Sequence, residues 1–318
     1  MSWDEWLLSM HGGQDVESFL LSAFQYDVTS RLRSGVVHVT SVFPVSVTVA
    51  HADCFSDLTY HTIRIAPRSP KSIFDAFMLS LTRASADFVI ATGKIVRCEP
   101  DYTVECLSPF GPALEDWRTS VLHRAAPPQS VVLTAQPDVD VSHVLFQRAK
   151  KPLPSTQNAC GSEELRDKPY PVVLFTNAQV APQLERLISS SLPSDCSCVS
   201  VQAHPQCSIS TAVDYCLKRP DATISIEAGP RSSLDLYRCR PIRVDTLLLS
   251  IYHGAVSDTQ PAPADEESKC AMHVQSASAV LAMSAGPFLT QHFLDQYFQL
   301  AARCVDGDWE FRVYAALR

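Results

Sequence analysis

The stretch from Ala222 to Gly254, ATISIEAGPRSSLDLYRCRPIRVDTLLLSIYHG, constrains the fold of this chain more than any other part of it. It opens with alternating β-forming residues, breaks at Gly229-Pro230, continues through a short segment ending near Tyr237 and closes with an apolar run from Val244 to Tyr252. This pattern predicts a strand, a tight glycine turn, a short helix and a second strand within about thirty residues. Such a turn presents backbone N–H groups at a helix N-terminus, where the partial positive charge favours a phosphate.

Length and charge exclude several classes of protein. A chain of 318 residues, of which 46% are hydrophobic, can bury the core of one large α/β domain or of two smaller ones. Its net charge of −8 argues against a nucleic-acid binder, and the absence of any run of about eighteen apolar residues argues against a membrane protein. The N-terminus lacks a cationic region and a cleavage site, and the eleven cysteines have no paired spacing. These features favour reduced thiols and a cytoplasmic location.

Strands and helices alternate along the chain. A helical region over 3–23 precedes a β-rich run, Val36–Ala50, which Pro44 is expected to split or bend, and Ser69-Pro70 is expected to start a helix. Short buried strands are predicted at Asp87–Ala91, Ser130–Ala135, Pro171–Thr176 and Cys198–Ala203, with helices at Gln183–Ser189 and Ser208–Lys218. The chain is expected to close with a strand at Met272–Met283, a helix at Phe288–Cys304 and a strand at Trp309–Ala316.

The predicted organisation is a helical extension over residues 1–35 followed by one domain over residues 36–318. Polar, proline-containing insertions are expected near 150–168 and 257–269. The second contains QPAPADEESK, which has almost no apolar side chains to bury, so we expect Thr259–Lys269 to be exposed and mobile.

Residues 83–100, RASADFVIATGKIVRCEP, carry a family resemblance. Their order resembles the pyrimidine reductases of riboflavin biosynthesis, in which Arg-x-x-Ala-Asp-Ala leads into a strand and then a Gly-x-x-Thr-Val-Arg-x-Asp-x-Pro turn. Glu227-Ala228-Gly229-Pro230 resembles that family's Glu-Gly-Gly-Pro turn, and the terminal GDWEFRVY resembles its closing strand. The resemblance extends from about Val36 onward. It implies a dihydrofolate-reductase-like α/β fold, a three-layer sandwich with a mostly parallel central sheet.

The same resemblance implies an activity and a site. The activity is NADPH-dependent reduction of 5-amino-6-(5-phosphoribosylamino)uracil or of another small heterocyclic substrate. Glu99 is placed at the substrate, and no catalytic residue is assigned. The residues placed at the cofactor are Thr92, Gly93, Thr134, Thr176, Glu227, Ala228, Gly229, Pro230 and Arg231.

Two departures from the family pattern keep other functions open. The family's Ser-x-Asp-Gly signature is missing from Pro44–Ala50, and Glu105 stands where the family has an arginine for the substrate phosphate. A glutamate repels a phosphate. Besides a reductase with an altered substrate, the sequence is therefore compatible with a catalytically inactive descendant that acts as a protein-interaction module, or with a nucleotide-binding sensor.

Metal chemistry is not expected. Cys196, Cys198, His204 and Cys207 lie close together, but they lack the paired C-x₂₋₄-C spacing of structural zinc sites. The His-x-Glu and Pro-Cys-x-x-Cys signature of zinc deaminases is also absent from the sequence. The apolar face expected on a helix at Phe288–Cys304 is predicted to be core or a homodimer contact.

Overall fold

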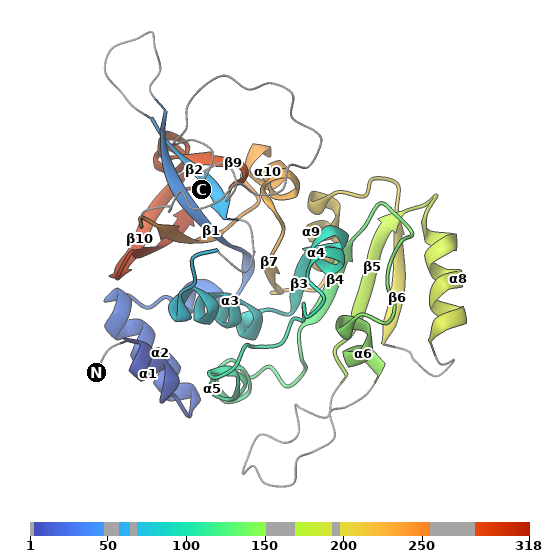
Figure 1. Ribbon diagram of the computed structural model, residues 1–318, viewed down its shortest axis with the longest axis horizontal. Coiled ribbons are helices and arrows are strands. Elements are labelled where there is room, and N and C mark those ends of the chain that lie inside the picture. Colours follow the sequence, from blue (N-terminus) through green and yellow to red (C-terminus); the bar gives the residue numbers. More distant parts are fainter. Residues whose placement is uncertain (1–2, 48–56, 64–68, 151–168, 193–197, 255–283) are drawn as a thin grey trace.

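The computed structural model describes residues 3–47, 57–63, 69–150, 169–192, 198–254 and 284–318. Its strands form one eleven-stranded sheet in the order β10-β11-β8-β1-β7-β3-β4-β5-β6, and β2 extends it by pairing with β1 and β9 (Figure 1). The strands are β1 (Gly35–Val47), β2 (Asp57–Ile63), β3 (Phe88–Thr92), β4 (Gln129–Leu133), β5 (Val172–Asn177), β6 (Val199–His204), β7 (Thr223–Ile226), β8 (Thr246–Tyr252), β9 (Ser284–Thr290), β10 (Phe298–Asp306) and β11 (Trp309–Ala316).

The centre of the sheet is parallel, from β8 through β1, β7, β3, β4 and β5 to β6, whereas β2, β9, β10 and β11 pair antiparallel. The helices are α1 (Trp3–Leu8), α2 (Gly13–Phe24), α3 (Ile73–Ser85), α4 (Gly93–Cys98), α5 (Gly111–Asp116), α6 (Val144–Lys150), α8 (Ala181–Ser191), α9 (Ile209–Cys216), α10 (Pro230–Arg238) and α12 (Gln291–Tyr297). Two single turns, at Thr29–Leu32 and Trp117–Val121, complete the helical elements described.

Helices cover both faces of the sheet, which gives three layers. Alternate residues of a strand point to opposite faces. On β1, Val36 packs with the core beneath α9, α10 and α12, whereas Val37 packs with α1, α2, α3 and α5. On β3, Val89 points to the same face as Val37, in a core shared with α6 and α8. The expected three-layer α/β sandwich with a mostly parallel sheet is therefore confirmed.

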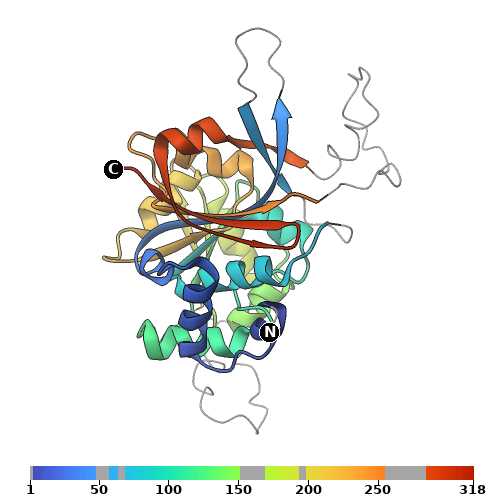
Figure 2. The ribbon, with the colours of Figure 1, turned by 90° about the vertical axis from the view of Figure 1, so that its left-hand side faces the viewer.

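Most predicted strands are found within a few residues of their expected limits, because strands buried on both faces read as short continuous apolar runs. The expected strand at Trp309–Ala316 matches β11. The first strand was expected to be split or bent at Pro44, but β1 continues through it. Beyond Val42, β1 has only β2 as a neighbour, so the missing N–H of Pro44 lies where no second strand needs it (Figure 2).

The helix expected from Ser69-Pro70 begins three residues later. Ser72 is its N-cap, and the Ser72 side chain accepts a hydrogen bond from the N–H of Asp75 at 3.2 Å. At Thr92 and Gly93, β3 passes directly into α4, whose N-cap is Thr92.

The helix expected at Phe288–Cys304 is wrong. That segment contains the end of β9, the two-turn helix α12 and most of β10. Thr290 caps α12 by accepting from the N–H of Phe293 at 3.1 Å, and the residues after Tyr297 pair with β11 instead. Tertiary pairing has overridden the helical spacing of the apolar residues. The face that suggested a homodimer contact therefore does not exist as one surface, and the homodimer stays a prediction.

Other expectations fall outside the described residues: the insertions near 150–168 and at Thr259–Lys269, and the strand at Met272–Met283. Within the described part of the chain, no helix is both long and apolar enough to cross a membrane.

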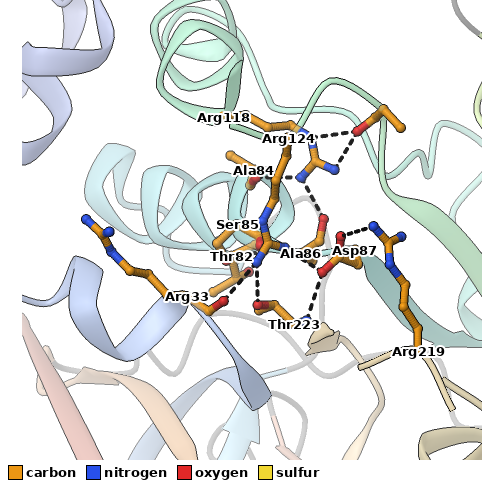
Figure 3. Close-up of polar contacts among 11 residues, drawn as sticks. Arg33, Thr82, Ala84, Ser85, Ala86, Asp87, Arg118, Arg124, Arg219 and Thr223 are labelled. Atoms are coloured by element: carbon orange, nitrogen blue, oxygen red, sulfur yellow. Dashed lines mark hydrogen bonds and ion pairs between the residues drawn. The ribbon is translucent and has the colours of Figure 1, made fainter. Parts of the chain in front are cut away.

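Arginine side chains tie the amino ends of β3 and β7 together (Figure 3). Asp87, 8% exposed, accepts from the N–H of Thr223 at 2.9 Å and pairs with Arg124 at 2.7 Å and with Arg219 at 3.3 Å. Arg118, buried beside it, donates to the carbonyl oxygens of Ala84, Ala86 and Ala126. The Ala-Asp part of the motif at 83–87 therefore serves the architecture of the sheet.

Candidate functional site

The two segments expected to bind a cofactor follow neighbouring parallel strands. Ile90 of β3 is in register with Ile226 of β7, and the N–H of Glu227 donates to the carbonyl of Ile90 at 2.9 Å. The start of α4 and the Glu227–Arg231 turn therefore lie side by side at the carboxyl edge of the sheet (Figure 1). Open α/β sheets place their ligands at this edge.

A buried ion pair between Arg83 and Glu227 lies in this region. Arg83, from α3, donates to both carboxylate oxygens of Glu227, with Nε–Oε1 at 2.7 Å and Nη2–Oε2 at 2.8 Å, and the two side chains are only 5% and 6% exposed. The hydroxyl of Tyr102 also donates to Glu227 Oε2, at 3.2 Å, and Arg83 Nη1 donates to the carbonyl of Glu105 at 3.1 Å. Bidentate contact fixes the Glu227 carboxylate in one orientation.

Glu99 lies near this pair and is half-buried. Burial raises the pKa of Glu99, and the negative charge of Glu227 raises it further, whereas Arg83 opposes the shift. His143 holds the segment in place through a hydrogen bond between its Nε2 and the carbonyl oxygen of Glu99 at 2.9 Å. A raised pKa favours the protonated form of a carboxyl group, and a general acid must be protonated to donate.

The turn after β7 leaves open space at the start of α10. Gly229 is the N-cap and is exposed, and a Cβ added to it would meet no atom within 4 Å. Pro230 occupies the first turn of α10, where its missing N–H costs nothing, and Ala228 is buried beneath it. Arg231 is exposed. A helix N-terminus beside open space and a cation suits an anionic group.

The start of α4 is packed more tightly. A Cβ on Gly93 would come within 3.0 Å of Cβ and Oγ1 of Thr134, so glycine is needed here for close packing. Thr92 Oγ1 accepts from the N–H of Ile95 at 3.4 Å, and Thr134 Oγ1 donates to the carbonyl of Gln136 at 2.9 Å. The structure thus brings Thr92, Gly93 and Thr134 together, with their hydroxyls already engaged. Their cofactor contacts stay predictions.

Thr176 lies apart from this group, on β5. It is fully buried, and within the described residues its Oγ1 has no hydrogen-bond partner. Its predicted contact with a cofactor would require movement of the surrounding side chains.

Glu105 is not a free acid at the position where the family has an arginine. It forms an ion pair with Arg148 of α6, and both side chains are about one-fifth exposed. This pairing offsets the negative charge that would otherwise repel a phosphate. Arg148 was not predictable as a partner of Glu105, because it lies more than forty positions further along the chain.

His38 lies on β1, in register with Ile226, and is fully buried. Its Nδ1 is 2.6 Å from the hydroxyl of Tyr237, which belongs to α10, and Phe288 packs edge-on against its ring. Burial lowers the pKa of His38 to about 4, and a hydrogen bond with the backbone of Ala228 opposes the shift. The imidazole is therefore neutral at pH 7. Its contact with Tyr237 joins β1 to α10, the helix that follows the Glu227–Arg231 turn.

This burial makes stability depend on pH. Below about pH 6.5 the unfolded chain gains a proton at His38, whereas the folded chain does not until about pH 4, so stability is lost as the pH falls through this window. We expect a loss of about 3 kcal/mol from this group. Urea unfolding at about pH 7 and about pH 4.5 should show that His38→Gln loses less stability than the wild type on acidification. His11→Gln, at an exposed position, should behave as the wild type does. Equal losses in the wild type and His38→Gln would contradict the assignment.

A cavity of about 290 Å³ lies away from these turns, between α12, β10 and β11. Its polar residues are already engaged: Arg312 donates to Glu310, Tyr60, Gln291 and Tyr314. Because these polar groups already have hydrogen-bond partners, we interpret the lining of the cavity as a structural network. Within the described part of the chain, no group of three metal-ligating side chains is found, and Cys196 lies outside that part.

Sequence reasoning did not assign Arg83 and Tyr102 to the site. Arg83 was visible as the first residue of the motif at 83–87, where it served only to identify the resemblance. Tyr102 gave no signal, because its contact with Glu227 joins residues 125 positions apart.

No protein-family model matches this chain, and no curated protein matches its sequence. Its structure is similar to that of a pyrimidine reductase-like protein from Corynebacterium diphtheriae, with a TM-score of 0.51 and 17% identity over 96% of this chain and 99% of that one. A deaminase/reductase from Thermotoga maritima aligns with a TM-score of 0.45 and 11% identity, covering 91% of this chain and 58% of that one. The riboflavin biosynthesis reductase of Saccharomyces cerevisiae aligns with a TM-score of 0.43 and 8% identity, over 90% and 91%. The first of these similarities shows a shared fold.

Proposed function

We propose that this chain is an NADPH-dependent reductase similar to 5-amino-6-(5-phosphoribosylamino)uracil reductase, with an altered heterocyclic substrate. The observation that carries the proposal is the half-buried Glu99 beside the buried Arg83–Glu227 pair, next to the open start of α10. A proton donor and an anion-binding helix end thus occupy the same edge of the sheet. The fold shared with a pyrimidine reductase-like protein agrees with this assignment.

The residues at the start of α10 fit a dinucleotide. The open space beside Gly229 leaves room for a diphosphate, the N–H groups of Gly229 and Arg231 can donate to it, and the Arg231 side chain adds a positive charge. When bound, NADPH supplies the hydride, and the protein supplies position and electrostatics.

Glu99 supplies the proton in this proposal. Addition of a hydride to a carbon that is doubly bonded to nitrogen or oxygen leaves negative charge on the heteroatom. The raised pKa of Glu99 favours the protonated form of its carboxyl group, which can neutralise that charge. Arg83 and Tyr102 hold the Glu227 carboxylate in place, and its negative charge contributes to the raised pKa of Glu99.

A second candidate is a catalytically inactive descendant that binds a nucleotide or a protein. The presence of Glu105 where the family has an arginine for the substrate phosphate favours it, because that position then supplies no cation. The seven described cysteines are all free thiols, which is typical of proteins in a reducing compartment. A cytoplasmic location is therefore part of the proposal, and it fits either function.

Titration with NADPH and NADH, followed by nicotinamide fluorescence, tests cofactor binding. Gly229→Val should abolish NADPH binding while leaving the fold intact, because the added side chain fills open space and the backbone at φ −62° and ψ 167° suits any residue. Arg231→Gln should weaken NADPH binding about tenfold, as expected for loss of one charge-assisted contact. Arg238→Gln removes the same charge from the other end of α10 and should leave the affinity unchanged.

Absence of NADPH affinity in the wild type at millimolar concentration would end the reductase proposal. It would leave the protein-interaction module as the remaining candidate.

A further inference from the structure

A buried histidine contacts residues on both sides of the Glu227–Arg231 turn. His38 lies on β1, in register with the last residue of β7. Its Nδ1 is 2.6 Å from the hydroxyl of Tyr237, in the last turn of α10, and its ring interacts with the backbone of Ala228. One side chain of β1 therefore contacts both the residue that precedes Gly229 and a residue eight positions after Gly229.

Aromatic side chains shield this contact from water. Phe288, on β9, packs edge-on against both rings, and its ring centroid lies 5.4 Å from that of His38 and 5.4 Å from that of Tyr237. Phe293 and Phe298 also pack against the Tyr237 ring. His38 and Tyr237 are both buried. A hydrogen bond in apolar surroundings is strong, and a buried polar atom that loses its partner is costly, so the Tyr237 hydroxyl is held in one position.

The first turn of α10 needs support from outside the helix. Its N-cap is Gly229, which has no side chain to accept from the free N–H groups. The N–H groups of Ser232 and Ser233 both donate to the carbonyl of Gly229 at 3.1 Å, so the turn is already formed. The helix has nine residues and spans about 12 Å from its first to its last residue. Fixing Tyr237 near its end therefore also fixes the direction in which its N-terminus points.

We infer that His38, acting through Tyr237 and Ala228, is a positioning residue for the anion-binding end of α10. It sets the orientation in which the N–H groups of this end meet a diphosphate, so that little order has to be gained on binding. The imidazole is neutral at pH 7, so its role is one of position and not of charge. The inference rests on the proposed function, because it concerns the same end of α10, and it adds a residue that does not touch the ligand.

Amide exchange measured by NMR tests the inference without any cofactor. Tyr237→Phe removes the hydroxyl and keeps the ring, and Tyr314→Phe is its matched control. Tyr314 is also buried, its hydroxyl accepts from Arg312 at 3.0 Å, and it pairs with the start of β8, at the opposite edge of the sheet. In Tyr237→Phe, exchange at Ser232 and Ser233 should be at least about tenfold faster than the change in global stability explains. In Tyr314→Phe, it should change only as far as global stability does.

Fluorescence titration with NADPH provides the second measurement. Tyr237→Phe and His38→Leu should each raise the Kd for NADPH about tenfold, whereas Tyr314→Phe should keep the wild-type value. His38→Asn, whose amide places a polar atom near the position of Nδ1, should recover part of the affinity that His38→Leu loses.

Equal exchange at Ser232 and Ser233 in the two tyrosine variants would overturn the inference, as would faster exchange in Tyr237→Phe with an unchanged Kd for NADPH. A wild type that does not bind NADPH would instead overturn the proposed function. The exchange rates, which need no cofactor, would then still decide whether the contact between His38 and Tyr237 fixes the start of α10.

Discussion

Replacing Arg83 by methionine is expected to lower the free energy of unfolding by about 3–5 kcal/mol, because it leaves the Glu227 carboxylate buried without its cation. The loss should be visible as a lower urea midpoint with an unchanged dependence on urea concentration. Glu227 would keep only the hydrogen bond from Tyr102, at 3.2 Å. Few single substitutions in this chain should have a larger effect on stability.

Two further variants test this explanation. The double variant Arg83→Met/Glu227→Leu removes both charges and should recover most of the lost stability, since a buried pair contributes little beyond its apolar replacement. Arg97→Met breaks the exposed pair with Asp138, at 3.2 Å, and should cost at most about 1 kcal/mol. If Arg83→Met were no more damaging than Arg97→Met, the burial of the Arg83–Glu227 pair would not govern its energetics.

The second large effect concerns turnover. Glu99→Gln is expected to lower kcat for reduction of 5-amino-6-(5-phosphoribosylamino)uracil or its analogues by about 10²–10⁴, because glutamine cannot donate the proton that follows the hydride. NADPH affinity should be retained, since α10 is untouched. In the wild type, turnover should fall as the pH rises above the raised pKa of Glu99, where the proton is lost. Glu99→Gln should lack this decrease.

Asp101→Asn controls for the loss of one negative charge at the end of α4, because Asp101 is exposed and two residues away. It should leave both kcat and the pH profile unchanged. A Glu99→Gln variant that retained turnover within about twofold would show that the proton comes from elsewhere, such as water.

The parts of this structure that local patterns specify were predictable from the sequence. The buried strands β3, β4 and β5 read as short apolar runs and β7 as alternating β-forming residues, and the Gly229-Pro230 break marked the start of α10. Their arrangement at one sheet edge followed from parallel pairing. The prediction for Phe288–Cys304 was wrong because apolar residues spaced for one helix face also alternate well enough for β10, and only pairing with β11 decides between them.

The chemistry between distant residues was not predictable in the same way. Arg83 and Tyr102 acquire their roles from Glu227, which lies 144 and 125 positions further along the chain, and nothing near them in sequence signals these contacts. A buried carboxylate differs from an exposed one only in its surroundings. The sequence could therefore place Glu99 and Glu227 at the edge of the sheet, but not the cation and hydroxyl groups that set their charge.

The position of β1 has a consequence for how the chain is made. This thirteen-residue strand lies at the centre of the sheet, but its parallel neighbours, β7 and β8, are encoded about 190 to 210 residues later. During synthesis, β1 can pair early only with β2, because β7 and β8 are complete only once Ile226 and Tyr252 have been made. An apolar strand with unpaired edges is prone to association with other chains. We therefore expect newly made chains to be prone to association until β7 and β8 have paired with β1.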